Sequence, residues 1–179
     1  LGRAEAVDAG HGQGGQLAGG HGGQLGEAQR RDLGVAHAAE LGGVRAALRW
    51  HRDDLDPVLP PAVAYGGAWH PVIAVATRAR LADLHYDFDA LAALMASRGW
   101  TTINLVWRED AHTLHARNPF PPGGVVEDPA TGAAAAALGA YLAGQDQLPD
   151  DRRFTIHQGH DLGCPSVLRV DVPVDVRDG

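Results

Sequence analysis

The chain has 179 residues, a net charge of -7 at pH 7 and 45 % hydrophobic residues. This length suits one domain or two small lobes. The negative charge argues against a nucleic acid partner, because binding phosphates needs a basic face. No apolar run reaches the roughly 18 residues of a membrane span. The only cysteine is Cys164, so no intrachain disulfide can form. We expect a cytoplasmic protein that binds neither nucleic acid nor membrane.

Glycine dominates the first segment, residues 1–32. The apolar residues there follow neither the period of a strand nor that of a helix. This composition predicts a disordered or frame-disrupted segment. His11 and His21 stand alone among the glycines and do not define a metal site.

The next segment, residues 33–61, begins with LGVAHAAELGG. This pattern predicts a short helix that stops at Gly42 and Gly43. Residues 48–61 form a polar stretch that ends in two prolines, which break regular structure. We therefore expect a connection there.

The middle of the chain alternates strand-like and helix-like patterns. β-Branched and apolar runs predict strands, and a capped stripe of apolar residues predicts a helix. The expected elements are a strand before the Gly66-Gly67 kink, a strand over 72–76, a helix over 87–99, strands over 101–107 and 112–117, and a turn-rich loop over 118–124.

Residues 127–142 read EDPATGAAAAALGAYL. Alanine and leucine predict a helix over 133–142 that ends at Ala143-Gly144. The free N–H groups at its start attract anions, and Asp128 lies beside them. One interpretation is a proton-transfer group next to a substrate carboxylate. The alternative is plain helix capping by Asp128 or Thr131.

Two further strands are expected over 153–158 and 167–176, the second near a sheet edge because it contains Pro173. A helix that is apolar nearly all round is usually enclosed. The order of elements therefore predicts an α+β lobe whose strands wrap around a central helix.

Three segments carry a resemblance to a known family: GAWHPVIAV at 67–75, ARNPFPPGGVVEDPATGAAAAALGAYL at 116–142 and IHQGHDLGCPS at 156–166. In order and spacing they resemble the phenazine-biosynthesis PhzF-like family, relatives of diaminopimelate epimerase. The resemblance implies a curved mixed or antiparallel sheet around an Ala-rich helix, with residues 62–179 as the C-terminal lobe. It also implies a site in the cleft between two lobes, no metal or organic cofactor, a small carboxylate-bearing substrate and a possible homodimer.

The resemblance also implies roles for individual residues. Asp128 falls on the family's acidic residue, which makes it the expected catalytic acid or base. The expected substrate-binding residues are Thr131, Gly132, Ala133, Gln158 and Gly159. Ala133 stands where the family commonly has serine, and Cys164 stands where it usually has arginine.

The first lobe of the family is the part that this chain matches least. The family's early Ser-Glu pair has no counterpart, since the only serines are Ser97 and Ser166. Arg30 stands where a family histidine is expected, and His21 is a weaker substitute. We therefore expect 33–61 to be a remnant of an incomplete first lobe.

Two functions remain open from the sequence. The first is a PhzF-like isomerase or epimerase that moves a proton by acid–base chemistry and whose activity the loss of the first lobe would impair. The second is a catalytically inactive lobe that acts as an anion-binding or protein-interaction module.

His157, His160 and Asp161 suggest zinc, because imidazole and carboxylate are zinc ligands. A structural role is the simpler interpretation of these residues and of His70, so we expect no metal. We expect Cys164 to be a half-buried, inert thiol.

Overall fold

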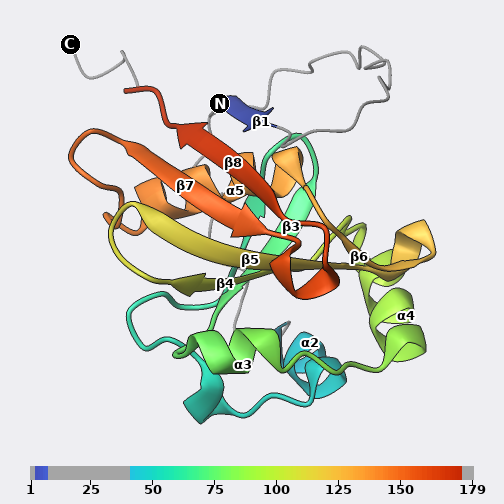
Figure 1. Ribbon diagram of the computed structural model, residues 1–179. Helices are drawn as coiled ribbons and strands as arrows, with labels where there is room; N and C mark the ends of the chain where they lie inside the picture. Colours follow the sequence, from blue (N-terminus) through green and yellow to red (C-terminus); the bar gives the residue numbers. More distant parts are fainter. Residues whose placement is uncertain (1–2, 8–40, 175–179) are drawn as a thin grey trace.

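The computed structural model describes residues 3–7 and 41–174, and one curled sheet surrounds one buried helix (Figure 1). The strands are β1 (Arg3–Val7), β2 (Ala62–Tyr65), β3 (Trp69–Ala74), β4 (Asn104–Arg108), β5 (Thr113–Phe120), β6 (Val125–Asp128), β7 (Arg153–Gln158) and β8 (Ser166–Asp171). Their order is β1-β8-β7-β5-β4-β3-β2, and β6 pairs with β5. The pairs β3–β4 and β5–β7 are parallel, and the others are antiparallel. The predicted α+β fold is confirmed.

The central helix α5 (Gly132–Gly144) lies behind the sheet in Figure 1 and contacts β1, β2, β3 and β8. Its predicted range is confirmed, with a start one residue earlier. Most of its residues are buried, and they form one core with Val72, Val106 and Leu168. The Tyr141 hydroxyl donates to the carbonyl of Pro60 over 2.7 Å. Its alanines let the helix lie close to the strands, because they add little bulk.

The other face of the sheet is covered by α2 (Leu41–Leu48), α3 (Arg78–Ala82) and α4 (Phe88–Arg98). Short 3₁₀ turns lie at Arg52–Asp54, Pro121–Gly123 and His160–Leu162. Successive residues of β3 alternate between the faces: Val72 packs in the α5 core, and Ile73 packs in the outer core. This alternation lets one strand support two cores.

Helix α4 confirms its predicted start and stop. The Asp87 carboxylate accepts a hydrogen bond from the N–H of Ala90, and Gly99 ends the helix in the left-handed conformation at φ 66°. Leu91 and Met95 are fully buried.

Helix α2 differs from its prediction. Gly42 and Gly43 lie inside it instead of ending it, and the helix runs on to Leu48. Burial of Val44 and Leu48 stabilises this turn and outweighs the low helix propensity of glycine. The predicted helical residues 33–40 lie outside the described residues.

Three strand predictions also need correction. β3 begins at Trp69, and β5 continues to Phe120 through residues assigned to a loop, because β6 pairs with them. β8 ends at Asp171, so Pro173 follows the strand. β8 is not an edge strand, because it lies between β7 and β1.

The three predicted segments are placed only in part. Residues 3–7 form β1, within the segment whose composition predicts no regular structure, and residues 8–32 lie outside the described part. Leu59 belongs to the inner core and Val44 to the outer core, so 41–61 pack with the strands that follow. Their assignment to a first lobe stays a prediction. Within 41–174, no helix is long and apolar enough to cross a membrane.

We predict that Gly66→Ala destabilises the fold by about 1–3 kcal/mol, the usual effect of overpacking. A Cβ at Gly66 would lie 2.2 Å from the carbonyl oxygen of Ala133 and 2.5 Å from the nitrogen of Ala137. Urea unfolding measures the effect.

The matched control is Gly42→Ala, where a Cβ meets nothing within 4 Å. It should be neutral or stabilise the helix by up to about 1 kcal/mol. Equal unfolding midpoints for the two variants would contradict the close contact between Gly66 and the backbone of α5.

Candidate functional site

Asp128 is the last residue of β6 and lies half-buried beside the start of α5. Its Oδ2 accepts a hydrogen bond from the Thr131 hydroxyl over 2.8 Å, and its Oδ1 accepts one from the N–H of Ala130 over 3.3 Å. Both donors are neutral and local. They hold the carboxylate next to the helix end and leave it further lone pairs for other donors.

The start of α5 has no side-chain cap. Thr131 is at the capping position, but its side chain makes no capping bond and donates to Asp128 instead. The first N–H groups of a helix have no partner within it, and they carry partial positive charge. Gly132 is exposed and Ala133 half-buried at this end. Thr131 therefore does not cap this helix in the structure, and anion binding at its start stays a prediction.

Gln158, at the end of β7, is 2 % exposed and uses its whole amide on the loop before α5. Its Nε2 donates to the carbonyl of Asp128 over 2.7 Å and to the Thr131 hydroxyl over 3.0 Å. Its Oε1 accepts from the N–H of Thr131 over 3.2 Å. Gln158 therefore fixes the 128–131 turn in this structure, and its expected contact with a substrate stays a prediction.

Gly159 lets the backbone at Cys164 and at Pro129, in the loop before α5, lie close to it. Its φ is +76°, and a Cβ there would lie 2.1 Å from the carbonyl oxygen of Cys164 and 2.9 Å from that of Pro129. The Ser166 hydroxyl donates to the Pro129 carbonyl over 2.7 Å. Ser166 is not among the predicted site residues, because no local pattern marks a contact across 37 residues of chain.

A buried ion pair between Arg117 and Glu127 also holds β6, the strand that ends at Asp128. The Arg117 Nε donates to Glu127 Oε2 over 2.9 Å, a second Arg117 nitrogen contacts Oε1, and Arg117 Nη1 donates to the carbonyl of Ala82 over 2.7 Å. The Tyr86 hydroxyl donates to the carbonyl of Val126. Burial, followed by the negative charge of Glu127, raises the pKa of Tyr86 to about 12. The two residues just before Asp128 are therefore held by polar contacts, of which the Arg117–Glu127 pair is buried, and no pattern in the sequence predicts them.

The zinc alternative finds no support in the part of the chain that the structure describes. The His157 and His160 rings lie 5.5 Å apart, and both Asp161 oxygens accept from Arg78 over 3.0 Å. Across 41–174, no three potential ligands gather in a way that could hold a metal ion. Cys164 is exposed, which corrects the prediction of a half-buried thiol.

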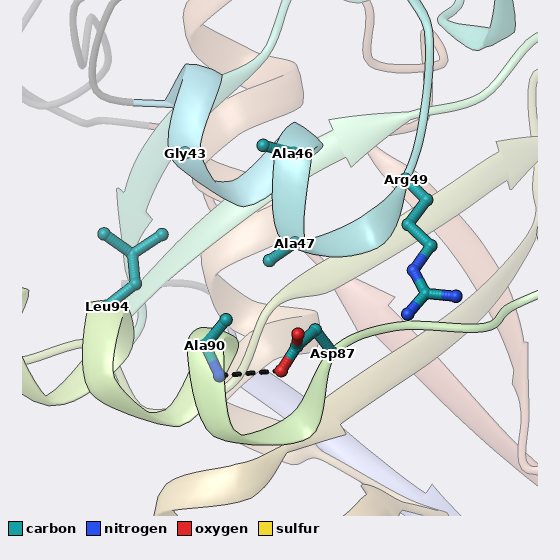
Figure 2. A pocket seen from close by; sticks show the side chains of 7 residues that line it. All are labelled: Gly43, Ala46, Ala47, Arg49, Asp87, Ala90 and Leu94. Atoms are coloured by element: carbon teal, nitrogen blue, oxygen red, sulfur yellow. Dashed lines mark hydrogen bonds between the residues drawn. The ribbon is translucent and has the colours of Figure 1, made fainter.

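A shallow hollow between α2 and α4 is separate from this site (Figure 2). Small side chains line most of it, and Arg49 and Asp87 lie at one end. The Asp87 carboxylate already accepts the capping bond from Ala90, drawn as a dashed line in Figure 2. None of the predicted site residues lines this hollow, so it does not take part in the chemistry of Asp128.

A sequence profile of the family described as phenazine biosynthesis-like protein matches residues 35–179. The chain belongs to this family, the PhzF family.

Its PhzF relatives include proteins named as isomerases. The chain is 32 % identical over 146 residues to an uncharacterized isomerase of Deinococcus radiodurans, a match that covers 74 % of this chain and 47 % of that protein. It is also 32 % identical over 115 residues to the trans-2,3-dihydro-3-hydroxyanthranilate isomerase of Pseudomonas chlororaphis, covering 63 % and 39 %. The chain thus spans less than half the length of these curated relatives.

Solved structures share the fold. A predicted epimerase of Pseudomonas aeruginosa matches with a TM-score of 0.59 at 23 % identity, covering 95 % of this chain and 52 % of that one. A PhzF family protein of Bacillus anthracis matches with a TM-score of 0.58 at 17 % identity, covering 72 % and 50 %.

We predict that Gln158→Leu destabilises the fold, because it leaves the N–H of Thr131 without its acceptor and removes both donors of the amide. Each buried polar group left unpaired costs about 1–3 kcal/mol. Urea unfolding measures the loss. Gln145→Leu is the control, because no hydrogen bond is described for the Gln145 side chain and its loss should change stability little. A Gln158 variant as stable as the Gln145 variant would remove the amide from the support of the turn.

We predict a pH dependence of stability that involves His70, which is fully buried. Burial lowers the pKa of His70, against a smaller opposing effect of a hydrogen bond with the backbone of Thr102. The unfolded chain takes up this proton below pH of about 6.5, and the folded chain does so only at lower pH. Folding free energy is therefore lost as the pH falls through this window, by at most about 1.4 kcal/mol per pH unit.

Melting temperatures between about pH 7.5 and pH 5 test this prediction, because this range spans the ordinary histidine pKa of about 6.5. His70→Gln should flatten the decrease, and replacement of the exposed His85 by Gln should not. Parallel curves for the wild type and His70→Gln would rule out the linkage.

Proposed function

We propose that this chain supplies an acid–base carboxylate, Asp128, and an anion-binding helix end, the start of α5, for the isomerisation of a small carboxylate-bearing metabolite. The observation that carries the proposal is the position of Asp128 beside an uncapped helix N-terminus. The names of the curated relatives support an isomerase or epimerase reaction.

The physical chemistry of the site supports the same reaction class. Removal of a proton next to a carboxylate or carbonyl group needs a positioned base. Fixed N–H dipoles stabilise the negative charge that then develops. In this proposal the N–H groups of Gly132 and Ala133 bind the ligand oxygen, and Asp128 exchanges the proton. The reaction needs no metal or organic cofactor.

The substrate that the relatives suggest is trans-2,3-dihydro-3-hydroxyanthranilate, which appears in the name of the Pseudomonas chlororaphis protein. It has a carboxylate on a small ring, as the helix end requires. A homodimer and a cytoplasmic location remain predictions from the sequence.

A second candidate function is an anion-binding module without catalysis. Proton transfer between two carbons usually needs both an acid and a base. Both donors to the Asp128 carboxylate in the described part of the chain are neutral, an amide and a hydroxyl. If no second titratable group reaches the substrate, the helix end binds the carboxylate and no proton moves.

We predict that Asp128→Asn lowers turnover of trans-2,3-dihydro-3-hydroxyanthranilate by at least about 100-fold, the usual contribution of a general acid or base. Asparagine keeps one oxygen that can accept from the N–H of Ala130, and its Nδ2 can donate to the Thr131 hydroxyl, so the melting temperature should change little. Deuterium uptake from D₂O, followed by mass spectrometry, measures proton transfer directly.

Asp171→Asn is the matched control, because Asp171 lies on β8 in an exposed ion pair with Arg153. Turnover by Asp128→Asn at the wild-type rate would remove Asp128 from the mechanism. 3-Hydroxyanthranilate, the aromatic analogue of the proposed substrate, serves as a probe of binding alone. If the wild type binds this analogue but shows neither turnover of trans-2,3-dihydro-3-hydroxyanthranilate nor deuterium uptake, the binding module is favoured.

A further inference from the structure

A row of buried polar side chains crosses the sheet beside the first turns of α5. His70 is on β3, Thr102 lies two residues before β4, and Asn118 is on β5. All three are at most 1 % exposed. His70 and Asn118 lie two residues from Val72 and Ala116, which pack around α5, so they share the inner face of the sheet. Thr102 contacts both of them there.

The hydrogen bonds in this row have a defined direction. The Thr102 hydroxyl lies 2.9 Å from His70 Nδ1 and donates to Asn118 Oδ1 over 3.1 Å. A hydroxyl has one proton, so Thr102 must accept from a protonated Nδ1 of His70. With Asn118 Oδ1 facing Thr102, these bonds set the His70 tautomer and leave Asn118 Nδ2 outside the row.

Asn118 is paired directly with Asp128 in the ladder between β5 and β6. Side chains of directly opposed residues lie on the same face, with Cβ atoms about 4.5–5.5 Å apart. In the described part of the chain the buried Asn118 Nδ2 has no hydrogen-bond partner. The Asp128 carboxylate has one described donor on each oxygen, so it can accept more.

We propose that Asn118 is a positioning residue for the Asp128 carboxylate, held in orientation by Thr102 and His70. This inference rests on the proposed function of Asp128. In the structure the Thr131 hydroxyl holds the carboxylate through Oδ2. Each carboxylate oxygen keeps a further lone pair, so one can exchange a proton with a substrate while the other bonds remain. A bond from Asn118 Nδ2 to the carboxylate then fixes which lone pair faces the substrate.

The experiment compares Thr102→Val with Thr102→Ser. Valine has nearly the shape of threonine but cannot hydrogen-bond to His70 or Asn118, whereas serine keeps the hydroxyl. With trans-2,3-dihydro-3-hydroxyanthranilate, Thr102→Val should lower kcat by about 10- to 100-fold, the range expected for a displaced catalytic group. KM should change by less than about threefold, because the ligand still binds the start of α5. Thr102→Ser should restore most of kcat.

Thr155→Val controls for the loss of a strand threonine, because Thr155 lies on β7 outside the buried row and no hydrogen bond is described for its hydroxyl. Melting temperatures show whether each variant folds. If Thr102→Val does not fold, Asn118→Ala replaces it, since it removes the amide and keeps the bond between His70 and Thr102. Wild-type kcat in the folded variant, or an equal loss in Thr102→Ser, would overturn the proposal.

A second readout does not depend on turnover and so separates this proposal from the proposed function. The ¹³C signal of the Asp128 carboxyl group, assigned with Asp128→Asn, is recorded with and without 3-hydroxyanthranilate. The ligand-induced change should be the same in the wild type and Thr102→Ser and altered in Thr102→Val. The same change in all three would overturn the role of Asn118, even if the chain catalyses the reaction. An altered change in a chain without turnover would support the positioning role and contradict the proposed catalysis.

Discussion

The close enclosure of α5 by the sheet is the constraint on which the rest of the structure depends. The helix has almost no polar side chains, so it is stable only when strands cover it on several sides. Two glycines mark how close this contact is. Gly66 leaves space for the backbone of α5, and Gly139 of α5 leaves space for Val170 and Val172. Because the helix is fixed along its length, the position of its N-terminus is fixed as well.

Asp128 depends on this fixed helix end but gains its orientation from residues far away in the chain. Gln158 holds the turn from β7, Ser166 holds Pro129 from β8, and the pair of Arg117 and Glu127 holds β6. Several strands therefore meet at the site. Among the described donors to the Asp128 carboxylate, Ala130 and Thr131 are close to it in the sequence. A carboxylate supported in this way keeps its geometry when its surface neighbours change.

Sequence reasoning found the elements whose signals are local. The alanine helix and α4 follow from propensity, periodicity and caps, and Asp128 follows from a motif next to a helix start. It missed β6 and the extension of β5, because four residues between glycines and α5 become a strand only when they pair with β5. It ended α2 at the glycines, because burial of Val44 and Leu48 cannot be read from propensity. The roles of Ser166, Asn118 and Thr102 depend on contacts between strands, which leave no pattern in a single sequence.

The pairing of β1 with β8 has a consequence for the order in which the chain folds. These strands come from opposite ends of the described chain, and β8 lies between β1 and β7. During synthesis β1 is made well before β8, so it lacks this partner until Ser166–Asp171 has been made. Contacts between such distant segments form slowly, because closing a long loop costs entropy before the contact forms. The pairing of β1 with β8 is thus a late step in the folding of the described residues, and until then β8 has one side open to other strands.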